Sequence, residues 1–446
     1  MKLYNTATRK LEDFKPLGDV VKIYTCGPTV YSTPHIGNYA AYIYWDLLVR
    51  TLIAEGYNVD RVLNLTDVGH LVSDGDEGED KLEKGAAREG KSVWEIAEHY
   101  INIYLGDFRA LNLLEPEKIC RATDYIEQDK AAVDAMTKNG YTYETSDGIY
   151  FDTAKFAGYA DFAHLDLEHI KAGARVDFNA EKRNPSDFAV WKFIKPGEKH
   201  AMRWDYLDRP GYPGWHLECS TIINAELGEP IDIHTGGIDH IPVHHTNEIA
   251  QTYAISGHEL AKYWLHCNFI NIDGQKISKS LGNVYTLDDL AARGFSPMDY
   301  KMWVLQGHYQ GDRNFTFDSL EAAKARRLAW RNRIALTFQG NITSSTDISS
   351  IVEAVSNNLN SAEAFARVDG AVLSFEDWQN VDALFGLNLI NDSPDISDAQ
   401  KALLSARAEA RANKDWQKSD NLRTELEATG ITIKDTPTGQ IWQYLH

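Results

Sequence analysis

The first 65 residues alternate between short apolar runs and turn signals. Residues 21–26 (VKIYTC) form a β-branched apolar run that predicts a strand, and Gly27-Pro28 directly after it predicts a turn. Residues 37–53 are aromatic and aliphatic, which fits a buried helix, and residues 58–65 predict a second strand. Strand, turn, helix and strand in this order begin a βαβ unit, so we expect a parallel sheet.

A second set of such elements follows an interruption. Residues 140–210 are rich in turns and short strands, which indicates an insertion between two halves of the sheet. Beyond it, residues 231–234 predict a strand that ends in Gly236-Gly237. Residues 246–255 predict a helix, and residues 264–272 predict a further strand that leads into a loop. The insertion would therefore separate two groups of strands that belong to one sheet.

From residue 286 the pattern becomes helical, and Pro394 marks a boundary within the helical part. The expected fold class is α/β, with a Rossmann-type parallel sheet as the first domain. The predicted domains are a sheet-containing unit at 1–285 with a connective insertion at about 110–210, a helical bundle at 286–393 and a small C-terminal domain at 394–446.

Charge is unevenly distributed along the chain. The 446 residues include 45 Lys and Arg against 65 Asp and Glu, a net charge of −20, which taken alone argues against a nucleic-acid partner. Residues 319–336, however, carry five basic side chains and one acidic one, whereas residues 347–398 carry ten acidic and one basic. The predicted helix at 319–336 would therefore offer RNA a basic track, and binding would be salt-sensitive and confined to one face.

The cysteines indicate a reducing compartment, because the four of them show no close pairing. The N-terminus lacks the apolar core of a signal peptide, and no stretch approaches 18 apolar residues. We therefore expect a cytoplasmic protein without a membrane span.

Two segments about 240 residues apart have the composition of a polyphosphate site. Residues 34–38 (PHIGN) stand directly ahead of the first long helix, where unpaired N–H groups bind phosphate and an imidazole stabilises its charge. Residues 276–280 (KISKS) place Lys276 and Lys279 three apart in a loop that can close over a polyphosphate. Taken alone, the first segment also fits an ordinary turn and the second a solvated basic loop. The two segments together are a far more specific signal of a polyphosphate site.

A metal site is the third candidate. His244 and Glu248 are four residues apart, so on a helix they share a face and can bind one ion. Cys26 ends a strand and Cys219 follows a Gly-Trp turn, and two thiolates, an imidazole and a carboxylate suit zinc better than calcium or magnesium. The alternative is that both cysteines are small buried hydrophobes, as we expect for Cys120 and Cys267.

Five motifs in a fixed order carry a resemblance to one enzyme family. They are CGPTVY at 26–31, HIGN at 35–38, GWHLECS at 214–220, HHTNE at 244–248 and KISKS at 276–280. In order and spacing these motifs resemble the cysteinyl-tRNA synthetases, class I aminoacyl-tRNA synthetases. The likeness runs from KLYNTATR near the start to GQIWQ near the end, so it covers essentially the whole chain.

The resemblance implies which residues bind what. In this family one zinc ion per subunit lies on the floor of the amino-acid pocket and takes the thiolate of the substrate cysteine. A hydroxyl is a poorer zinc ligand, so serine should be rejected without editing. The positions that match the zinc ligands are Cys26, Cys219, His244 and Glu248. Those that match the contacts of the substrate cysteine are Gly27, Thr66, Trp215 and Asp239. Those that match the ATP-binding and catalytic signatures are His35, Gly37, Asn38, Lys276 and Lys279.

The resemblance also implies the reaction and its partners. L-cysteine would attack the α-phosphorus of ATP, with Mg²⁺ bound to the nucleotide, to give cysteinyl-adenylate and pyrophosphate. The terminal ribose hydroxyl of tRNA-Cys would then displace AMP. The protein would contribute mainly positioning and electrostatics, and it would be a monomer whose 286–393 region contacts the tRNA stem.

Four positions depart from the commoner family pattern. Asn38 replaces the second His of the first signature but can still donate a hydrogen bond, and Ile277 replaces Met as a change of packing only. Val68-Gly69-His70 precede an acidic run at 73–80 where acidic residues usually follow at once, which changes the rim of the site. Thr246 stands where Glu is usual and is not an expected ligand.

The C-terminal segments RANKDWQKSDNLR and IKDTPTGQIW resemble the anticodon-binding domain of the family. Trp416 and Trp442 would stack on splayed bases, and Arg411, Asp420 and Asp435 would contact base edges. The alternative for this region is a small helical cap with ordinary surface charges.

Two other functions are compatible with parts of this sequence. One is an ATP-dependent cysteine ligase that acts on an amino-sugar acceptor, as in mycothiol synthesis; it shares the zinc pocket and both ATP signatures but lacks an anticodon domain. The tail at 401–446 disfavours it. The other is a regulator without catalysis that binds RNA or cysteine, and the intact signature residues disfavour that reading.

Overall fold

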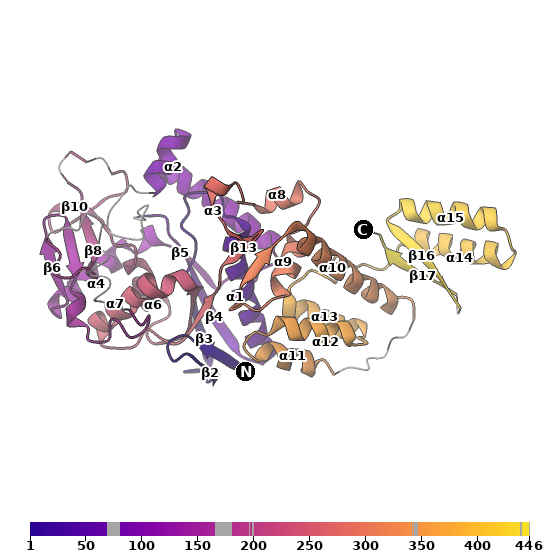
Figure 1. The fold of residues 1–446 in the computed structure, drawn as a ribbon, viewed down its shortest axis with the longest axis horizontal. Coiled ribbons are helices and arrows are strands. Elements are labelled where there is room, and N and C mark those ends of the chain that lie inside the picture. Colours follow the sequence, from indigo (N-terminus) through magenta and orange to yellow (C-terminus); the bar gives the residue numbers. More distant parts are fainter. Residues whose placement is uncertain are drawn as a thin grey trace.

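The computed structural model describes residues 1–68, 81–165, 181–195, 197–198, 200–340, 342, 347–437 and 439–445. The acidic run predicted at the rim of the site, with Gly69 and His70 before it, lies outside these residues. The molecule is elongated (Figure 1), with an antiparallel sheet at one end, a parallel sheet in the middle and a helical part that ends in a small C-terminal domain. No helix among the described residues is long and apolar enough to cross a membrane.

The central sheet has five parallel strands in the order β12-β11-β3-β4-β5, which confirms the α/β class. The strands are β3 (Val20–Thr25), β4 (Asn58–Leu65), β5 (Lys118–Arg121), β11 (Ile231–Gly237) and β12 (Ala261–Cys267). β5 is an edge strand paired with β4, so the parallel sheet continues past residue 110, where the insertion was predicted to start.

Helices cover both faces of this sheet because its strands are apolar on both sides. Ile23 and Leu63 belong to the largest core, which contains α1 (Ile36–Ala54). Their neighbours along the two strands, Tyr24 after Ile23 and Val62 before Leu63, belong to the core on α6 (Leu217–Glu226). Successive side chains on a strand point to opposite faces, so the sheet lies between α1 and α6.

The insertion contains the second sheet, with strand order β6-β7-β8-β10-β9 and antiparallel pairing throughout. Its strands are β6 (Thr142–Thr145), β7 (Gly148–Phe151), β8 (Phe188–Phe193), β9 (Trp204–Tyr206) and β10 (Arg209–Pro213). Its apolar core is shared with α4 (Ile126–Lys138) and α7 (Thr246–Ser256), which attach it to the central unit. Two further helices, α2 (Lys81–Glu89) and α3 (Val93–Ala110), precede β5, and β1 (Lys2–Asn5) pairs with β2 (Lys10–Asp13) at the N-terminus.

The strand predicted at 264–272 is two strands in two sheets. β12 ends at Cys267, where the chain turns at Asn268, whose side chain donates to Asp312 over 2.8 Å. The next strand joins a small sheet that carries the KISKS loop, with strands β13 (Ile270–Ile272), β14 (Gln275–Lys276) and β15 (Arg313–Phe315). A continuous apolar pattern in the sequence hid this change of sheet.

The region after residue 286 is helical, as predicted. Its helices are α8 (Leu287–Ala291), α9 (Pro297–Leu305), α10 (Phe317–Thr337), α11 (Ser349–Ser356), α12 (Ser361–Gly370) and α13 (Phe375–Phe385). The last domain contains α14 (Asp398–Ala412), α15 (Trp416–Ala428) and a hairpin of β16 (Ile431–Thr436) and β17 (Gly439–Tyr444). β17 packs on α10, and Gln339 exchanges hydrogen bonds of 2.9 and 2.8 Å with the backbone of Trp442.

The basic face expected on α10 is largely neutralised within the protein. Arg326 pairs with Asp369, the buried Arg327 pairs with Asp392, and Arg333 donates to the backbone oxygen of Val368 over 2.8 Å. The partners belong to the acidic segment that follows α10 in the chain. The two opposite charge blocks of the sequence therefore fold against each other, and the open basic track expected for RNA is not formed by these arginines.

A buried carboxyl lies between α4 and α6. Asp129 accepts a hydrogen bond of 2.6 Å from the Thr221 hydroxyl, and its other oxygen has no hydrogen-bond partner among the described residues. Burial raises the pKa of Asp129 to about 7, although the bond from Thr221 works to lower it.

We expect this carboxyl to make stability fall as the pH rises from about 4 to 7. The folded state keeps the proton up to about pH 7, whereas the unfolded chain releases it near pH 4, so stability is lost by about 1.4 kcal/mol per pH unit between them. Asp129→Asn keeps the acceptor for Thr221 and should remove this dependence. Melting midpoints at pH 5 and pH 7 measure it, and an equal difference between parent and variant at both pH values would contradict the prediction.

Candidate active site

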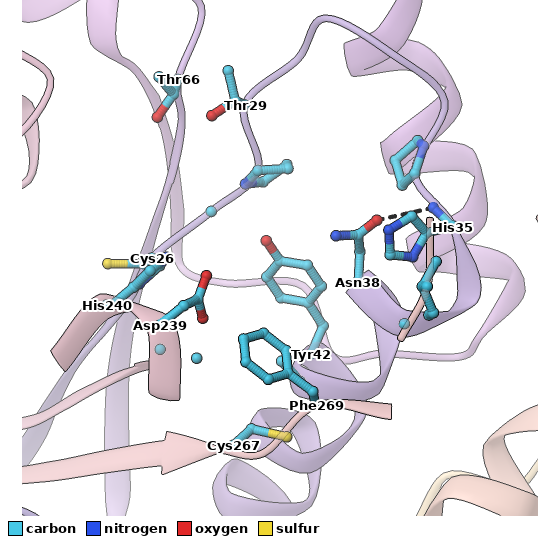
Figure 2. A pocket seen from close by; sticks show the side chains of 18 of the residues that line it. Cys26, Thr29, His35, Asn38, Tyr42, Thr66, Asp239, His240, Cys267 and Phe269 are labelled. Carbon is cyan, nitrogen blue, oxygen red and sulfur yellow. Dashed lines mark hydrogen bonds between the residues drawn. The ribbon is translucent and has the colours of Figure 1, made fainter. Parts of the chain in front are cut away.

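The carboxyl ends of the parallel strands converge on one cavity of about 520 Å³. Cys26 follows β3, Thr66 follows β4, Asp239 follows β11, and Cys267 ends β12. Ligands of open parallel sheets bind at this edge, where the strand order reverses. Figure 2 shows Cys26 and Asp239 on one side of the cavity and His35 and Asn38 on the other.

Most of the site residues predicted from the sequence line this one cavity. They are Cys26, Gly27, His35, Gly37, Asn38, Thr66, Trp215, Cys219, Asp239, His244 and Lys276. Glu248 is fully buried beneath the wall. Lys279 begins a 3-10 turn, Lys279–Leu281, and its side chain lies outside what the structure describes. Motifs separated by more than 200 residues are thus brought together, while the role of each residue stays a prediction.

The four predicted metal ligands form one buried cluster. The donor atoms of Cys26, Cys219, His244 and Glu248 all lie within 4.8 Å of one another. His244 and Glu248 share a face across the start of α7, with His244 Nε2 2.8 Å from Glu248 Oε1. Two sulfurs, one imidazole nitrogen and one carboxylate oxygen, all shielded from water, are a donor set that fits zinc.

A second quartet shares two of these residues. His234 and His245 form an equally compact group with Cys26 and Glu248. Cys26, Cys219 and His244 line the cavity, whereas His234 and His245 do not. The first quartet is therefore the one that can reach a bound ligand.

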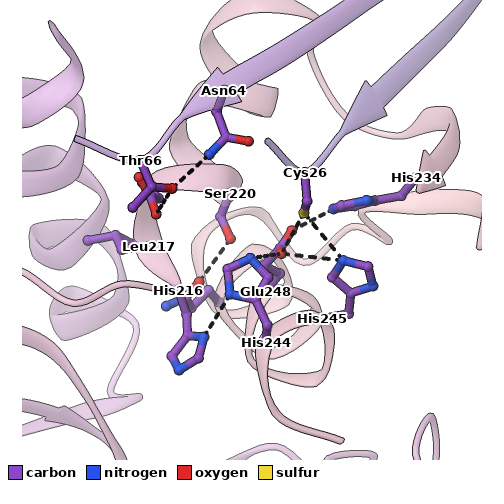
Figure 3. Close-up of polar contacts among 12 residues, drawn as sticks. Cys26, Asn64, Thr66, His216, Leu217, Ser220, His234, His244, His245 and Glu248 are labelled. Atoms are coloured by element: carbon purple, nitrogen blue, oxygen red, sulfur yellow. Dashed lines mark hydrogen bonds and ion pairs between the residues drawn. The ribbon is translucent and has the colours of Figure 1, made fainter. Parts of the chain in front are cut away.

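Histidines orient the cluster and set its charge (Figure 3). His234 Nε2 lies 2.7 Å from Glu248 Oε2, and His216 Nδ1 lies 3.0 Å from His244 Nδ1. Burial works against ionisation, but His234 and His244 lower the pKa of Glu248 to about 2. The pKa of Cys26 is lowered despite burial, by the hydrogen bond from Cys219 and the charges of His234 and His245. The site thus favours the anionic forms of Cys26 and Glu248, whereas burial and the neighbouring Cys26 raise the pKa of Cys219 well above its usual value.

The sequence analysis did not identify these supporting histidines, although His216 follows the predicted site residue Trp215 and His245 follows the predicted ligand His244. His216 lies within GWHLECS and His245 within HHTNE, so both motifs contained the signal. His234 lies on β11, and its ring stacks on Trp264 at 4.6 Å, a contact that the sequence does not reveal.

The opposite end of the cavity is the N-terminus of α1. The helix begins at Ile36, directly after His35, so residues 36–38 form its first turn instead of standing ahead of it as predicted. The backbone N–H of His35 donates to Asn38 Oδ1 over 2.9 Å, so the residue that departs from the family pattern caps the helix. Its amide NH2 is the donor end of the side chain, and the donor role of Asn38 toward ATP stays a prediction.

The KISKS loop is held against this helix. Asp273 and Gly274 both have positive φ, which allows the tight turn between β13 and β14. Asn283 closes the loop, because it accepts from the Ser278 N–H over 2.8 Å and donates to the Lys276 carbonyl over 3.1 Å. A methyl group added at Gly37 would lie 2.5 Å from Ile277 Cδ1, so the two signatures are in steric contact.

We expect Gly37→Ala to displace Ile277 and to weaken ATP-dependent activity. A shift of about 1 Å in a reacting geometry costs up to about 100-fold in rate, and the KM for ATP should rise about 10-fold or more. Ile277→Ala in the same chain removes the clashing methyl and should restore most of the loss. Steady-state kinetics with ATP measure both variants, and a double variant as impaired as Gly37→Ala would contradict the proposed contact.

Some of the predicted anticodon-contacting side chains are exposed, and others are buried or paired with charged neighbours. Trp416 is 55% exposed and Asp420 is exposed, both on α15. Asp435 is engaged by three arginines, with Arg407 as a bidentate partner at 2.9 and 3.1 Å, Arg411 at 3.2 Å and Arg423 at 3.1 Å. Trp442 is buried in the small core of the domain, so the stacking predicted for it is wrong.

Comparison with known proteins now adds to this geometry. The family described as tRNA synthetases class I (C) catalytic domain matches residues 14–325, and the cysteinyl-tRNA ligase anticodon binding domain matches residues 393–442. A cysteine–tRNA ligase of Burkholderia lata is 41% identical over 98% of this chain and 96% of its own length. The chain belongs to the cysteine–tRNA ligase family.

Other relatives agree over the full length. The cysteine–tRNA ligase of Treponema denticola is 36% identical over 100% of both chains. The methionyl-tRNA synthetase of Mycobacterium tuberculosis, solved in complex with methionyl-adenylate, has a TM-score of 0.55 at 15% identity over 91% of this chain and 88% of that chain. The similarity to the Mycobacterium tuberculosis structure supports the class I synthetase fold. The similarity to the Treponema denticola enzyme supports membership of the cysteine–tRNA ligase family across both domains.

Proposed function

We propose that this protein is a cysteine–tRNA ligase, which activates L-cysteine with ATP and transfers it to the 3′ end of tRNA-Cys. One observation carries the proposal. The thiol-rich quartet of Cys26, Cys219, His244 and Glu248 shares a cavity with the signature residues of an ATP site, in a chain that belongs to this family.

The quartet would hold one Zn²⁺ ion per subunit. Its donors fit that ion in softness and number, and three of the four residues line the cavity. When bound, the ion would supply a Lewis-acidic contact for the substrate thiolate and so discriminate cysteine from serine. Within the chain, His216 and His234 orient His244 and Glu248 for this role.

The remaining cavity residues would position the reacting groups. Thr66, Trp215 and Asp239 line the same cavity as three residues of the quartet and would hold the amino and carboxylate groups of cysteine. The N-terminus of α1 and Lys276 would bind the ATP phosphates, with Mg²⁺ on the nucleotide. A carboxylate oxygen forms a bond to the α-phosphorus as the bond to the leaving pyrophosphate breaks, and the protein stabilises the charge that develops.

Transfer to tRNA requires the C-terminal domain. The match of residues 393–442 to an anticodon binding domain supports tRNA-Cys as the partner and disfavours the amino-sugar ligase. We include Arg411, Trp416, Asp420 and Asp435 in the anticodon surface; the arginine contacts of Asp435 give it the added role of orienting Arg411. A monomeric state and a cytoplasmic location complete the proposal.

One assay tests the function at both steps. Cysteine-dependent exchange of labelled pyrophosphate into ATP measures activation, and acid-precipitable cysteine on tRNA-Cys measures transfer. We expect both, with serine inactive in exchange. Exchange without any charging of tRNA would favour the amino-sugar ligase, and failure of cysteine-dependent exchange would refute the proposal.

A further inference from the structure

The turn between α11 and α12 has an unusual backbone conformation. Asn358 and Leu359 both have positive φ, 59° and 54°, although neither is a glycine. Asparagine adopts this left-handed region at a small cost, whereas leucine does so only where its surroundings hold it there. Leu359 is fully buried, so the core fixes one residue of the pair. The side chain of the other residue, Asn358, is fixed by hydrogen bonds to distant parts of the chain.

Asn358 binds the segment that connects α9 with β15. Its Oδ1 accepts from the Tyr309 hydroxyl over 2.8 Å and from the backbone N–H of Tyr4 over 2.9 Å. Its Nδ2 donates to Gln310 Oε1 over 2.9 Å. Its carbonyl oxygen accepts from His308 Nε2 over 2.8 Å. Three consecutive residues of the segment are therefore bound to one asparagine.

The same segment holds the strands that carry the KISKS loop. The backbone N–H of Asn268 donates to the Tyr309 carbonyl over 2.8 Å, and the Asn268 side chain donates to Asp312 over 2.8 Å. Asn268 lines the cavity between Cys267 and Phe269, which Figure 2 shows. The next strand, β13, pairs with β15 and with β14, which contains Lys276. A continuous path of hydrogen bonds thus connects the α11–α12 turn with the KISKS loop.

This path reaches only one end of the cavity. It enters at Asn268 and continues into the small sheet of β13, β14 and β15. The thiols of the metal quartet come from the end of β3 and from α6, and its imidazole and carboxylate come from the start of α7. These elements take no part in the hydrogen bonds described above. A change at Asn358 would therefore act on the KISKS end of the cavity and leave the quartet in place.

We infer that Asn358 is a positioning residue for the nucleotide half of the reaction, which fixes the segment after α9 and, through Asn268, the placement of the KISKS loop against ATP. This inference rests on the proposed function. Asn358 does not line the cavity itself, so its effect on ATP passes through the residues it holds. The loss of its side chain should weaken the use of ATP and leave the use of cysteine almost unchanged.

Asn358→Gly tests the inference in the full-length protein. Glycine adopts a positive φ without strain, so the variant removes the side-chain bonds and keeps the backbone of the turn. A misplacement of about 1 Å in a reacting geometry costs up to about 100-fold in rate, so we expect the KM for ATP in pyrophosphate exchange to rise about 10-fold. The KM for cysteine should change less than about threefold, and the zinc content should equal that of the parent.

Two further variants examine the path one bond at a time. Asn358→Asp keeps an oxygen that accepts from the Tyr309 hydroxyl, and the Gln310 amide can turn to donate to the new carboxylate. This variant should return the KM for ATP to within about threefold of the parent. Tyr309→Phe removes one bond of the path and keeps the ring, so it should raise the KM for ATP selectively even if Asn358→Gly fails to fold.

Asn388 provides the matched control. It also has positive φ, 54°, and its side chain donates to Asp392 over 3.1 Å, but it belongs to none of the bonds of the path. Asn388→Gly should leave the KM values for ATP and for cysteine unchanged.

Three outcomes would overturn the inference. They are an unchanged KM for ATP in Asn358→Gly and Tyr309→Phe, KM values for ATP and cysteine that rise together, and an equal rise in Asn388→Gly. Absence of cysteine-dependent exchange in the parent would instead refute the proposed function.

Discussion

Cys219→Ser is expected to remove bound zinc and with it the cysteine-dependent exchange reaction. The substitution replaces one of two sulfur donors in a cluster whose ligand atoms lie within 4.8 Å of one another. Loss of a residue that only supports a metal ligand already costs about 10- to 100-fold in metal affinity, so loss of a ligand should cost at least that much. Metal analysis of the purified variant, together with pyrophosphate exchange, measures both effects.

Two other variants make this result specific. Cys120→Ser changes a cysteine that is equally buried but belongs to neither quartet, where its sulfur accepts from the Tyr125 hydroxyl, and it should keep one zinc per chain. His245→Asn removes a member of the second quartet only and should also keep the metal. Zinc retained in Cys219→Ser but lost in His245→Asn would place the ion in the second quartet.

The elements that set up the site were predictable because they are local. The strand at 21–26, the helix at 37–53 and the strand at 58–65 were predicted to within about a residue of β3, α1 and β4. Each has its own apolar period and its own turn or cap, such as Gly27-Pro28 after β3. Spacing on one helix likewise placed His244 and Glu248 on a shared face.

What the sequence could not reveal depends on contacts across the fold. Glu218 lies within GWHLECS, but its contact with Thr66 could not be inferred from that motif, because the two residues are 152 positions apart. The arginines of α10 are a basic stretch in the sequence, yet they lie against Asp369 and Asp392 once α12 and the segment after α13 fold back. Charges counted along the sequence do not show which side chains pair with each other in the folded protein. Binding of RNA depends on the basic side chains that remain without an acidic partner after folding.

The substrate-contacting residues predicted by resemblance could be inferred from the sequence only in part. Gly27, Thr66, Trp215 and Asp239 could be named from matching motifs, and the structure brings them to one cavity. Their neighbours in the fold are not contained in the motifs. Thr66, for example, contacts Asn64 and Glu218, and these contacts become visible only in the folded structure.

Asp46→Ala is expected to destabilise the protein by about 3–5 kcal/mol, because it leaves two buried cations without their counter-ion. Asp46 Oδ2 accepts from Arg50 Nε and from Lys301 Nζ, each at 2.8 Å, and the Asp46 and Lys301 side chains are fully buried. Burial lowers the pKa of Lys301 to about 8, against the opposing effect of Asp46. Loss of the carboxylate should lower that pKa further and favour neutral lysine.

The cluster joins parts of the chain that fold around α1. Arg50 donates to the carbonyl oxygens of Asn112 and Ala383, each over 2.8 Å, and Lys301 donates to Asn112 over 3.0 Å. The central sheet unit and the helical bundle share one apolar core and are further linked by this buried ion-pair cluster, so its loss should shift the urea midpoint of both together.

An exposed pair provides the matched control for this last prediction. Glu115 lies 3.1 Å from Arg109 with both side chains more than 60% exposed, where water and salt screen the attraction. Glu115→Gln should leave the urea midpoint unchanged within error while Asp46→Ala lowers it clearly. Equal midpoints for the two variants would mean that Arg50 and Lys301 find other partners or water, and that the buried carboxylate does not hold the bundle to the sheet.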